Sequence, residues 1–141
     1  HLNAFYYREQ EIATSAAKRI TKLIDSGLDP YDAFNVVQHQ MIDVAQAYLE
    51  RTVLEKFQVA IASIEDQNIK TVMKKLCQLY ALSQIEINKG WYLEDGYMEA
   101  VKTKAIRKMV NQLCWNLRPE AVSLVEAFNI PDSCLSAPIA F

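Results

Sequence analysis

Glycine, proline, cysteine and histidine are all scarce in this chain of 141 residues, which has 3 glycines, 4 prolines, 3 cysteines and 2 histidines. The glycines are scattered, so neither a Gly-x-Gly-x-x-Gly turn nor a Gly-Lys-Ser/Thr loop is present to wrap a nucleotide phosphate. The cysteines are odd in number and widely spaced, which excludes a disulfide framework and a Cys-x-x-Cys pair. Cys77 and Cys114 lie on apolar helical stretches, where we expect buried, reduced thiols. This usage favours a reducing compartment.

The shortage of histidine excludes most metal and catalytic arrangements. His1 is terminal, and His39 stands alone in the middle of a helical stretch. Val36, three residues before His39, takes the place of the glutamate that a di-metal bundle requires, and no zinc spacing occurs. Nothing in the sequence pairs His39 with Cys77 or Ser83 as a base with its nucleophile. We therefore predict no catalytic residue and no metal ligand, and we assign no cofactor-binding residue.

The chain also lacks an excess of either charge and any long apolar run. It has 15 basic and 17 acidic residues, with a net charge of −2, so the sequence predicts no nucleic-acid partner. No stretch is long enough for a membrane span, and no signal peptide is visible, so we do not expect secretion. Because the chain starts at His1 and not at Met, we expect a piece of a longer protein. Its length suits one domain, residues 1–141.

Apolar residues make up 51% of the sequence, and they recur with helical spacing. We predict an all-α, antiparallel, up-and-down bundle of four main helices plus a short C-terminal helix. No strand is predicted. The expected helices cover residues 2–26, 29–64, 66–90 and 99–117, and the short helix starts at 119.

Local signals mark the ends of these helices. Gly27 ends the first helix. Asp29 caps the second, with Pro30 in its first position, and Asp66 caps the third. Arg118 precedes a proline, so it should mark an end or a kink.

The second predicted helix is too long for a compact domain. At roughly 1.5 Å per residue it would extend for about 50 Å, whereas a domain of this size has a radius of gyration of about 14 Å. We expect that this helix either kinks or leans on a neighbouring body. Phe34, Met41 and Tyr48 repeat every seven residues, which predicts a seam between near-parallel helices.

Aromatic and acidic residues gather between the third and fourth helices. Trp91, Tyr92 and Tyr97 either cover the end of the bundle or stack on a flat ligand. A buried carboxylate among Glu94, Asp95 and Glu99 would be a candidate base, but the alternative is solvated loop and helix-terminal charge. At helical spacing, the methionines are expected to fill the core: Met41, Met73 and Met109.

The C-terminal part of the chain has the most specific sequence pattern. Residues 118–128 read Arg-Pro-Glu-Ala-Val-Ser-Leu-Val-Glu-Ala-Phe, and Ile-Pro-Asp follows at 130–132. After Asp132 no charge appears, and we expect this apolar tail to pack on another surface. This segment, with 29–35 and 76–82, resembles the C-terminal region of acyl-coenzyme A oxidases, flavoenzymes of fatty-acid β-oxidation.

The resemblance implies the second C-terminal helical domain of such an oxidase. The family's catalytic glutamate stands in a Tyr-Glu-Gly-(Glu/Asp)-Asn-like segment that has no match here, and neither has the flavin-binding β-domain. The fragment alone is therefore expected to be non-catalytic and to hold no cofactor, whereas the parent would use FAD and acyl-CoA. The implied partners are the rest of the oxidase chain and its dimer mate, and the implied role is to support the dimer and the flavin site.

The resemblance leaves the compartment and the rival functions open. The parent would be peroxisomal in a eukaryote, although the sequence ends in Pro138-Ile-Ala-Phe141 and not in a Ser-Lys-Leu-type signal, or cytoplasmic in a bacterium. One alternative is a free-standing helical module that binds an amphipathic partner helix. A second is a small-ligand bundle built on Trp91, Tyr92 and Tyr97, which would require a concave pocket beside them.

Overall fold

The computed structural model of the chain describes residues 1–131 and 134, and in this part every regular element is a helix. The four main helices are α1 (Leu2–Asp25), α3 (Gln38–Ala62), α4 (Gln67–Ile87) and α6 (Ala100–Leu117). Three short helices and one 3-10 turn connect or extend them: α2 (Pro30–Val36), α5 (Lys89–Glu94), η1 (Arg118–Glu120) and α7 (Ala121–Glu126). The predicted all-α class is confirmed.

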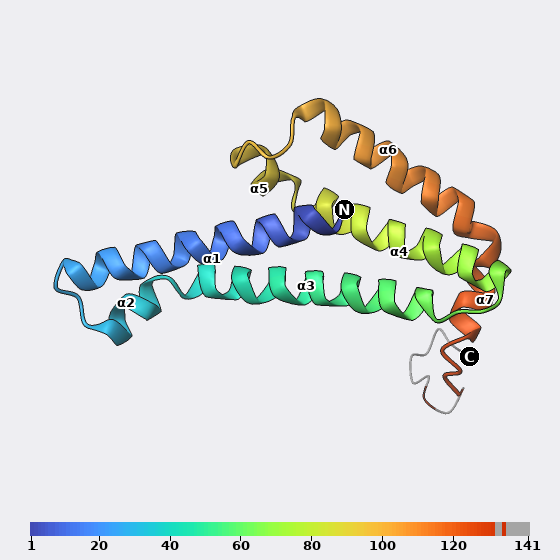
Figure 1. Ribbon diagram of the computed structural model, residues 1–141, viewed down its shortest axis with the longest axis horizontal. Helices are drawn as coiled ribbons and strands as arrows, with labels where there is room; N and C mark the ends of the chain where they lie inside the picture. The colour runs from blue at the N-terminus through green and yellow to red at the C-terminus, as the bar shows by residue number, and fades with distance from the viewer. Residues whose placement is uncertain (132–133, 135–141) are drawn as a thin grey trace.

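The main helices run up and down in sequence order (Figure 1). α1 packs on α3, α3 on α4, and α4 on α6. In Figure 1 the C-terminal half of α1, together with α2 and the start of α3, projects well beyond α4 and α6. We call this projection, residues 17–46, the arm, and the remainder the body. The second helical segment, which was expected to kink or to lean on a neighbouring body, thus projects in part beyond α4 and α6.

Residue chemistry explains most of the helix boundaries. Gly27, with a φ of +96°, ends α1, and the N–H of Leu28 donates to the carbonyl of Leu23 at 3.1 Å, which closes a Schellman turn. The Asp29 carboxylate accepts the N–H of Tyr31 at 2.9 Å, directly before Pro30. Both caps predicted from the sequence are present, because the Asp66 carboxylate likewise accepts the N–H of Asn68 at 2.7 Å.

The predicted helix over residues 29–64 is broken into α2 and α3, which is one of the two alternatives expected for it. It is divided at Val37, whose φ of −102° and ψ of 9° lie outside the helical region. Val37 is buried, and no proline or glycine stands there to mark the break. β-Branched and asparagine residues are weak helix formers, and Asn35, Val36 and Val37 follow one another here. The break lets α2 fold back against α1 at the tip of the arm.

The core lies in the body, where α1, α3, α4 and α5 meet. Eight buried residues form one hydrophobic cluster there: Ala4, Phe5, Leu54, Ile61, Cys77, Ala81, Ile85 and Tyr92. On α3 the buried positions Ala47, Leu54 and Ile61 repeat every seven residues. The predicted seam of Phe34, Met41 and Tyr48 is one position away from this register, and Phe34 and Tyr48 are exposed.

The C-terminal end bends away from α6. α6 stops at Leu117 and η1 follows, so the end predicted at Arg118 is confirmed. α7 then ends at Glu126, and Asn129 adopts a left-handed φ of +48°, a conformation that asparagine tolerates. The apolar tail predicted to pack on another surface lies outside the described residues, apart from Cys134, which is exposed.

Candidate functional site

The aromatic segment after α4 is a short helix, α5, and not the connection that the sequence predicted. Tyr92 is buried, and its hydroxyl donates to the carbonyl of Ala4 at 3.1 Å. Burial raises the pKa of the Tyr92 phenol. The Tyr97 ring stacks on the ring of Tyr7 with centroids 4.4 Å apart, and Trp91 meets Tyr7 edge-on at 6.1 Å. All three predicted aromatics therefore contact α1, and two of them, Trp91 and Tyr92, join α5 to it.

A concave space does lie beside Trp91. It has a volume of about 530 Å³ and is bounded by α1, α3 and the α4–α5 region, near the point where the arm leaves the body. We call it the junction cavity. Its lining residues are Arg8, Glu11, Ile12, Ser15, Gln40, Asp43, Asn88, Trp91 and Asp95. The pocket that a small-ligand bundle requires is thus present, but Tyr92 and Tyr97 do not line it.

A buried ion pair lies beside the junction cavity, and one of its members, Arg8, lines the cavity. Arg8 Nη1 donates to Glu50 Oε2 at 2.7 Å, and the two side chains are 7% and 9% exposed. Asn88 Nδ2 also donates to Glu50 Oε2 at 3.1 Å, and Gln46 Nε2 donates to Glu50 Oε1 at 2.9 Å. The Glu50 carboxylate is therefore well satisfied. Arg8 Nε, by contrast, is buried without a hydrogen-bond partner among the described residues, and so is Gln40 Oε1.

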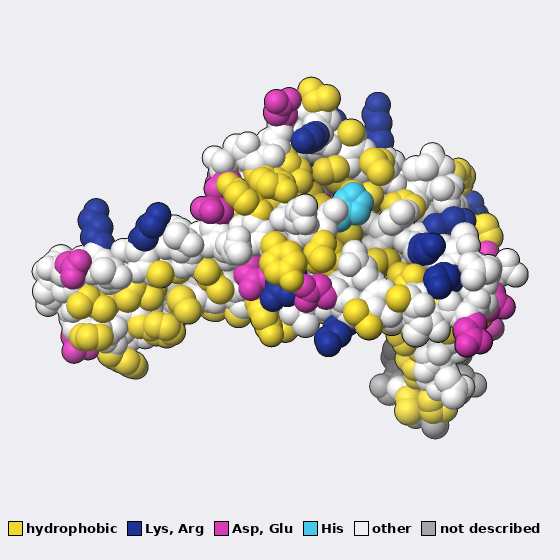
Figure 2. Space-filling view, viewed as in Figure 1, with side chains coloured by type: hydrophobic (Ala, Val, Ile, Leu, Met, Phe, Trp, Pro, Cys, Tyr) yellow, Lys and Arg dark blue, Asp and Glu magenta, His cyan; other side chains and the backbone are white. Residues whose placement is uncertain are grey.

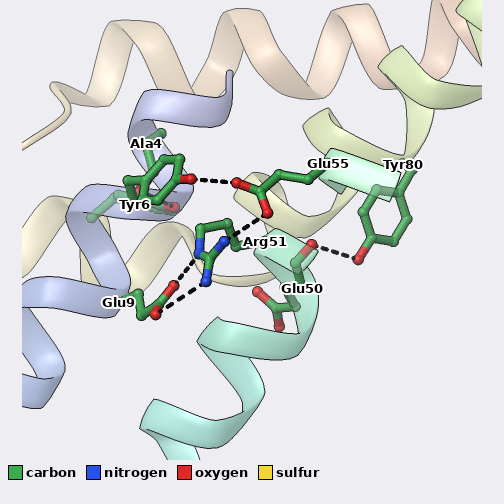
Figure 3. A network of polar contacts seen from close by, with 8 residues as sticks. Ala4, Tyr6, Glu9, Glu50, Arg51, Glu55 and Tyr80 are labelled. Atoms are coloured by element: carbon green, nitrogen blue, oxygen red, sulfur yellow. Dashed lines mark hydrogen bonds and ion pairs between the residues drawn. The ribbon is translucent and has the colours of Figure 1, made fainter. Parts of the chain in front are cut away.

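A second polar network ties α1 to α3 on the neighbouring turn (Figure 3). Arg51 donates to Glu9 and, at 2.7 Å, to Glu55, while the Tyr6 hydroxyl donates to Glu55. These glutamates raise the pKa of Arg51, and the hydrogen bond from Tyr6 lowers the pKa of Glu55. The Tyr80 hydroxyl donates to the carbonyl of Glu50 at 3.1 Å, which extends the network to α4. This network holds α1, α3 and α4 in register.

The acidic residues considered as bases are all exposed: Glu94, Asp95 and Glu99. Asp95 accepts a hydrogen bond of 2.7 Å from the Tyr7 hydroxyl, and this bond is the main cause that raises the pKa of Tyr7 to about 12. Glu99 is the N-terminal flanking residue of α6 and makes no side-chain cap there. Helix-terminal and loop charge is therefore the role that the structure supports for Glu94 and Glu99.

The thiols and methionines differ in part from expectation. Cys77 is buried, and burial raises the pKa of its thiol. Cys114 is exposed, so its predicted burial is wrong. Met41 and Met73 are half-buried, whereas Met109 faces solvent and does not fill the core.

His39 is exposed on α3, whereas Cys77 is buried and Ser83 is half-buried on α4. Within residues 1–131 and 134, no group of three or more histidine, cysteine or acidic side chains could hold a metal ion. None of the described helices combines the length and apolar character needed to cross a membrane.

Apolar side chains remain uncovered outside the cavity. On α3, Ile42, Leu49 and Val53 lie on one face, turned away from the core, and are 61%, 60% and 47% exposed. We call these three residues the α3 outer stripe. Tyr31, Phe34 and Val36 of α2 are also exposed nearby. Figure 2 shows hydrophobic side chains gathered along the arm.

A sequence profile of acyl-CoA oxidases matches residues 1–141, the whole chain. The chain belongs to the acyl-CoA oxidase family. Acyl-coenzyme A oxidase 2, peroxisomal, of Arabidopsis thaliana is 34% identical over 139 residues, which are 99% of this chain and 20% of that protein. A putative acyl-coenzyme A oxidase of the same plant is 32% identical over 140 residues, and the match spans 99% of this chain and 73% of that protein.

Solved acyl-CoA oxidases share the fold. The crystal structure of acyl-CoA oxidase 1 of Yarrowia lipolytica has a TM-score of 0.87 and 25% identity, over 99% of this chain and 20% of that one. Acyl-CoA oxidase-2 of Caenorhabditis elegans, bound with FAD, ascaroside-CoA and ATP, has a TM-score of 0.87 and 24% identity, over 93% and 20%. The chain thus corresponds to a fifth of the length of these oxidases. The resemblance to acyl-CoA oxidases predicted from the sequence is confirmed.

Proposed function

We propose that this chain is a non-catalytic helical domain of an FAD-dependent acyl-CoA oxidase. In this proposal, residues 1–141 form one domain, the second C-terminal helical domain of the parent. The parent oxidises an acyl-CoA with O2 to a trans-2-enoyl-CoA and H2O2, and the flavin and the catalytic base lie elsewhere in it. The domain packs on the catalytic core and supports the dimer and the flavin site. The peroxisomal names of relatives support the same compartment for the parent.

The observation that carries this proposal is the α3 outer stripe together with the apolar tip of the arm. Monomeric soluble domains rarely leave large contiguous apolar surfaces in water, and such surfaces mark contacts with another protein body. The arm also has few neighbours of its own, because α4 and α6 end short of it (Figure 1). An elongated projection with an uncovered apolar face is suited to lie along a larger body.

The test is a charge placed on that face in the full-length parent. Leu49→Asp should reduce the dimer fraction and the flavin retained after gel filtration, and peroxide release should fall with the flavin. Glu65→Asp, at an exposed position in the α3–α4 loop, is the control and should leave the dimer fraction, the flavin content and the peroxide release unchanged. An Leu49→Asp oxidase that keeps its dimer, flavin and turnover would contradict the proposal.

One observation favours a second function, that of a free-standing helical interaction module. The match spans 73% of the putative oxidase of Arabidopsis thaliana, which leaves only about a quarter of that protein for other domains. The native mass of the protein that contains this chain separates the two functions. A parent several times the mass of the 141-residue chain, with bound flavin, supports the oxidase domain. A protein of similar mass without flavin supports the module.

A further inference from the structure

A groove lined mostly by apolar side chains runs between the N-terminal half of α4 and α7. Two adjoining hollows, with volumes of about 410 and 320 Å³, form this groove and share the residues Met73, Leu124 and Ala127. Glu120 is the one charged residue among the described residues that line it. We call it the α4–α7 groove. Because it offers a single charge, it suits an uncharged occupant.

The groove and its rim are open to solvent. Val125 and Phe128, which line the groove, are 69% and 76% exposed, and Ile69 on the α4 side is 56% exposed. Val122 and Ile130, which are close to them in the sequence, are exposed as well. Soluble domains rarely leave a contiguous apolar surface uncovered, so this surface marks a contact.

The segment that follows α7 has a composition that matches the groove. Residues 133–141 carry no charged side chain. Side chains of an extended segment alternate between two sides, so every second residue shares one side, and here that side is apolar throughout: Leu135, Ala137, Ile139 and Phe141. Pro138 favours this conformation, because a proline restricts the residue before it to extended backbone. The sequence therefore supplies one apolar face suited to a narrow apolar groove.

The segment also starts at the edge of the groove. The chain leaves α7 through Phe128, a lining residue, and Asn129 then turns it with a left-handed φ of +48°. The N–H of Cys134 donates to the carbonyl of Pro131 at 2.8 Å, which makes a further turn. These turns keep the start of the segment near α7.

The segment is long enough to span the groove. The α4 wall from Asn68 to Leu76 extends for roughly 12 Å, at about 1.5 Å per residue. Residues 135–141 can extend for roughly 20 Å. Because the segment is tethered beside the groove, its effective concentration there is on the order of millimolar. The tether therefore favours this segment over a separate partner of similar affinity.

We propose that residues 135–141 fold back into the α4–α7 groove of the same chain. In the docked state the side chains of Ile139 and Phe141 pack against α4 at Met73, and Ser136 lies on the opposite side of the segment. This intramolecular contact covers the exposed apolar surface of α7 and fastens α7 to α4. The inference does not depend on the oxidase parentage, so it can fail while the proposed function stands.

The test is photocross-linking in the full-length protein, with p-benzoyl-phenylalanine in place of Phe141. Illumination should join this residue to the groove, and Met73 is the preferred target because benzophenone reacts readily with methionine. Mass spectrometry of the digested protein locates the bond, and a denaturing gel shows whether it lies within one chain or joins two. The same reagent in place of Tyr31, an exposed residue of α2 at the tip of the arm, is the control and should give no cross-link to α4.

A variant pair tests which side of the segment docks. Ile139→Asp places a charge on the apolar side and should lower the yield of the cross-link at least about threefold, because burial of the isoleucine side chain is lost. Ser136→Asp places the same charge on the opposite side and should leave the yield unchanged. The proposal is overturned if the benzophenone at position 141 joins another chain or another part of the protein, if it forms no cross-link in the groove, or if the two variants behave alike.

Discussion

Replacing Glu50 by glutamine tests the buried ion pair that joins α1 to α3. The carboxylate accepts hydrogen bonds from Arg8, Gln46 and Asn88, and both charged side chains are more than nine-tenths buried. The variant keeps the shape of the side chain but leaves the charge of Arg8, whose side chain is only 7% exposed, without its ionic partner. Breaking a buried pair in this way costs about 3 to 5 kcal/mol. For a domain of this size we expect the melting temperature to fall by roughly 10 °C or more.

The assay is urea and thermal unfolding of the purified chain, followed by far-ultraviolet circular dichroism. Glu55→Gln, on the same helix, is the matched control, because Glu55 pairs with Arg51 but its side chain is 30% exposed. We expect the control to lose much less than Glu50→Gln, because solvent screens the more exposed Glu55 pair. Replacing both Arg8 and Glu50 by methionine should recover most of the loss, since no unpaired charge then remains. A loss below about 1 kcal/mol in Glu50→Gln would refute the assignment of a desolvated pair.

Three further predictions follow from the core, the Tyr7–Asp95 contact and the thiols. Leu54→Ala, in the centre of α3, should cost about 2 to 5 kcal/mol in the same unfolding assay, whereas exposed Leu49→Ala should cost far less. In an absorbance titration Tyr7 should ionise near pH 12, and Asp95→Asn should shift that step toward 10, because the hydrogen bond to Asp95 raises the pKa of Tyr7 to about 12. Because the pKa of Tyr7 is higher in the folded than in the unfolded chain, the contact stabilises the fold below pH 10, and this stabilisation is lost as the pH rises from 10 to about 12. An unchanged ionisation of Tyr7 in Asp95→Asn would count against the contact. Under native conditions Cys114 should react with iodoacetamide and Cys77 should not, because burial raises the pKa of the Cys77 thiol and blocks access; equal rates at both thiols would contradict the burial pattern.

The helix ends were largely predictable from the sequence, because each depends on one or two adjacent residues. Asp29 and Asp66 cap their helices and Gly27 closes its turn, as local chemistry requires. The break at Val37 was not predictable in this way. It depends on how α2 folds back on α1, and Val37 carries no breaker of its own.

The predicted register of the second helical segment is wrong by one position, because the prediction placed large apolar residues in the seam. Phe34 and Tyr48 are larger and more apolar than alanine, yet Ala33 and Ala47 are the buried residues, since small side chains allow the helices to approach closely. The sevenfold spacing of Ala47, Leu54 and Ile61 was the available signal.

The junction cavity had no signature in the sequence. Its polar walls come from α1, α3 and the α4–α5 region, which are far apart in the chain, and charged residues such as Arg8 and Glu50 are seldom buried. Only Trp91 and Asp95 were considered beforehand, because they stood in an aromatic and acidic segment.

The proposal of a dependent, non-catalytic domain is tested most directly by peroxide release. The purified 141-residue chain and its full-length parent should be supplied with the same acyl-CoA and oxygen, and their flavin absorbance and hydrogen peroxide should be recorded side by side. We predict bound flavin and turnover in the parent, and neither in the chain alone. Peroxide production by the isolated chain, or a full-length parent without flavin, would contradict the account.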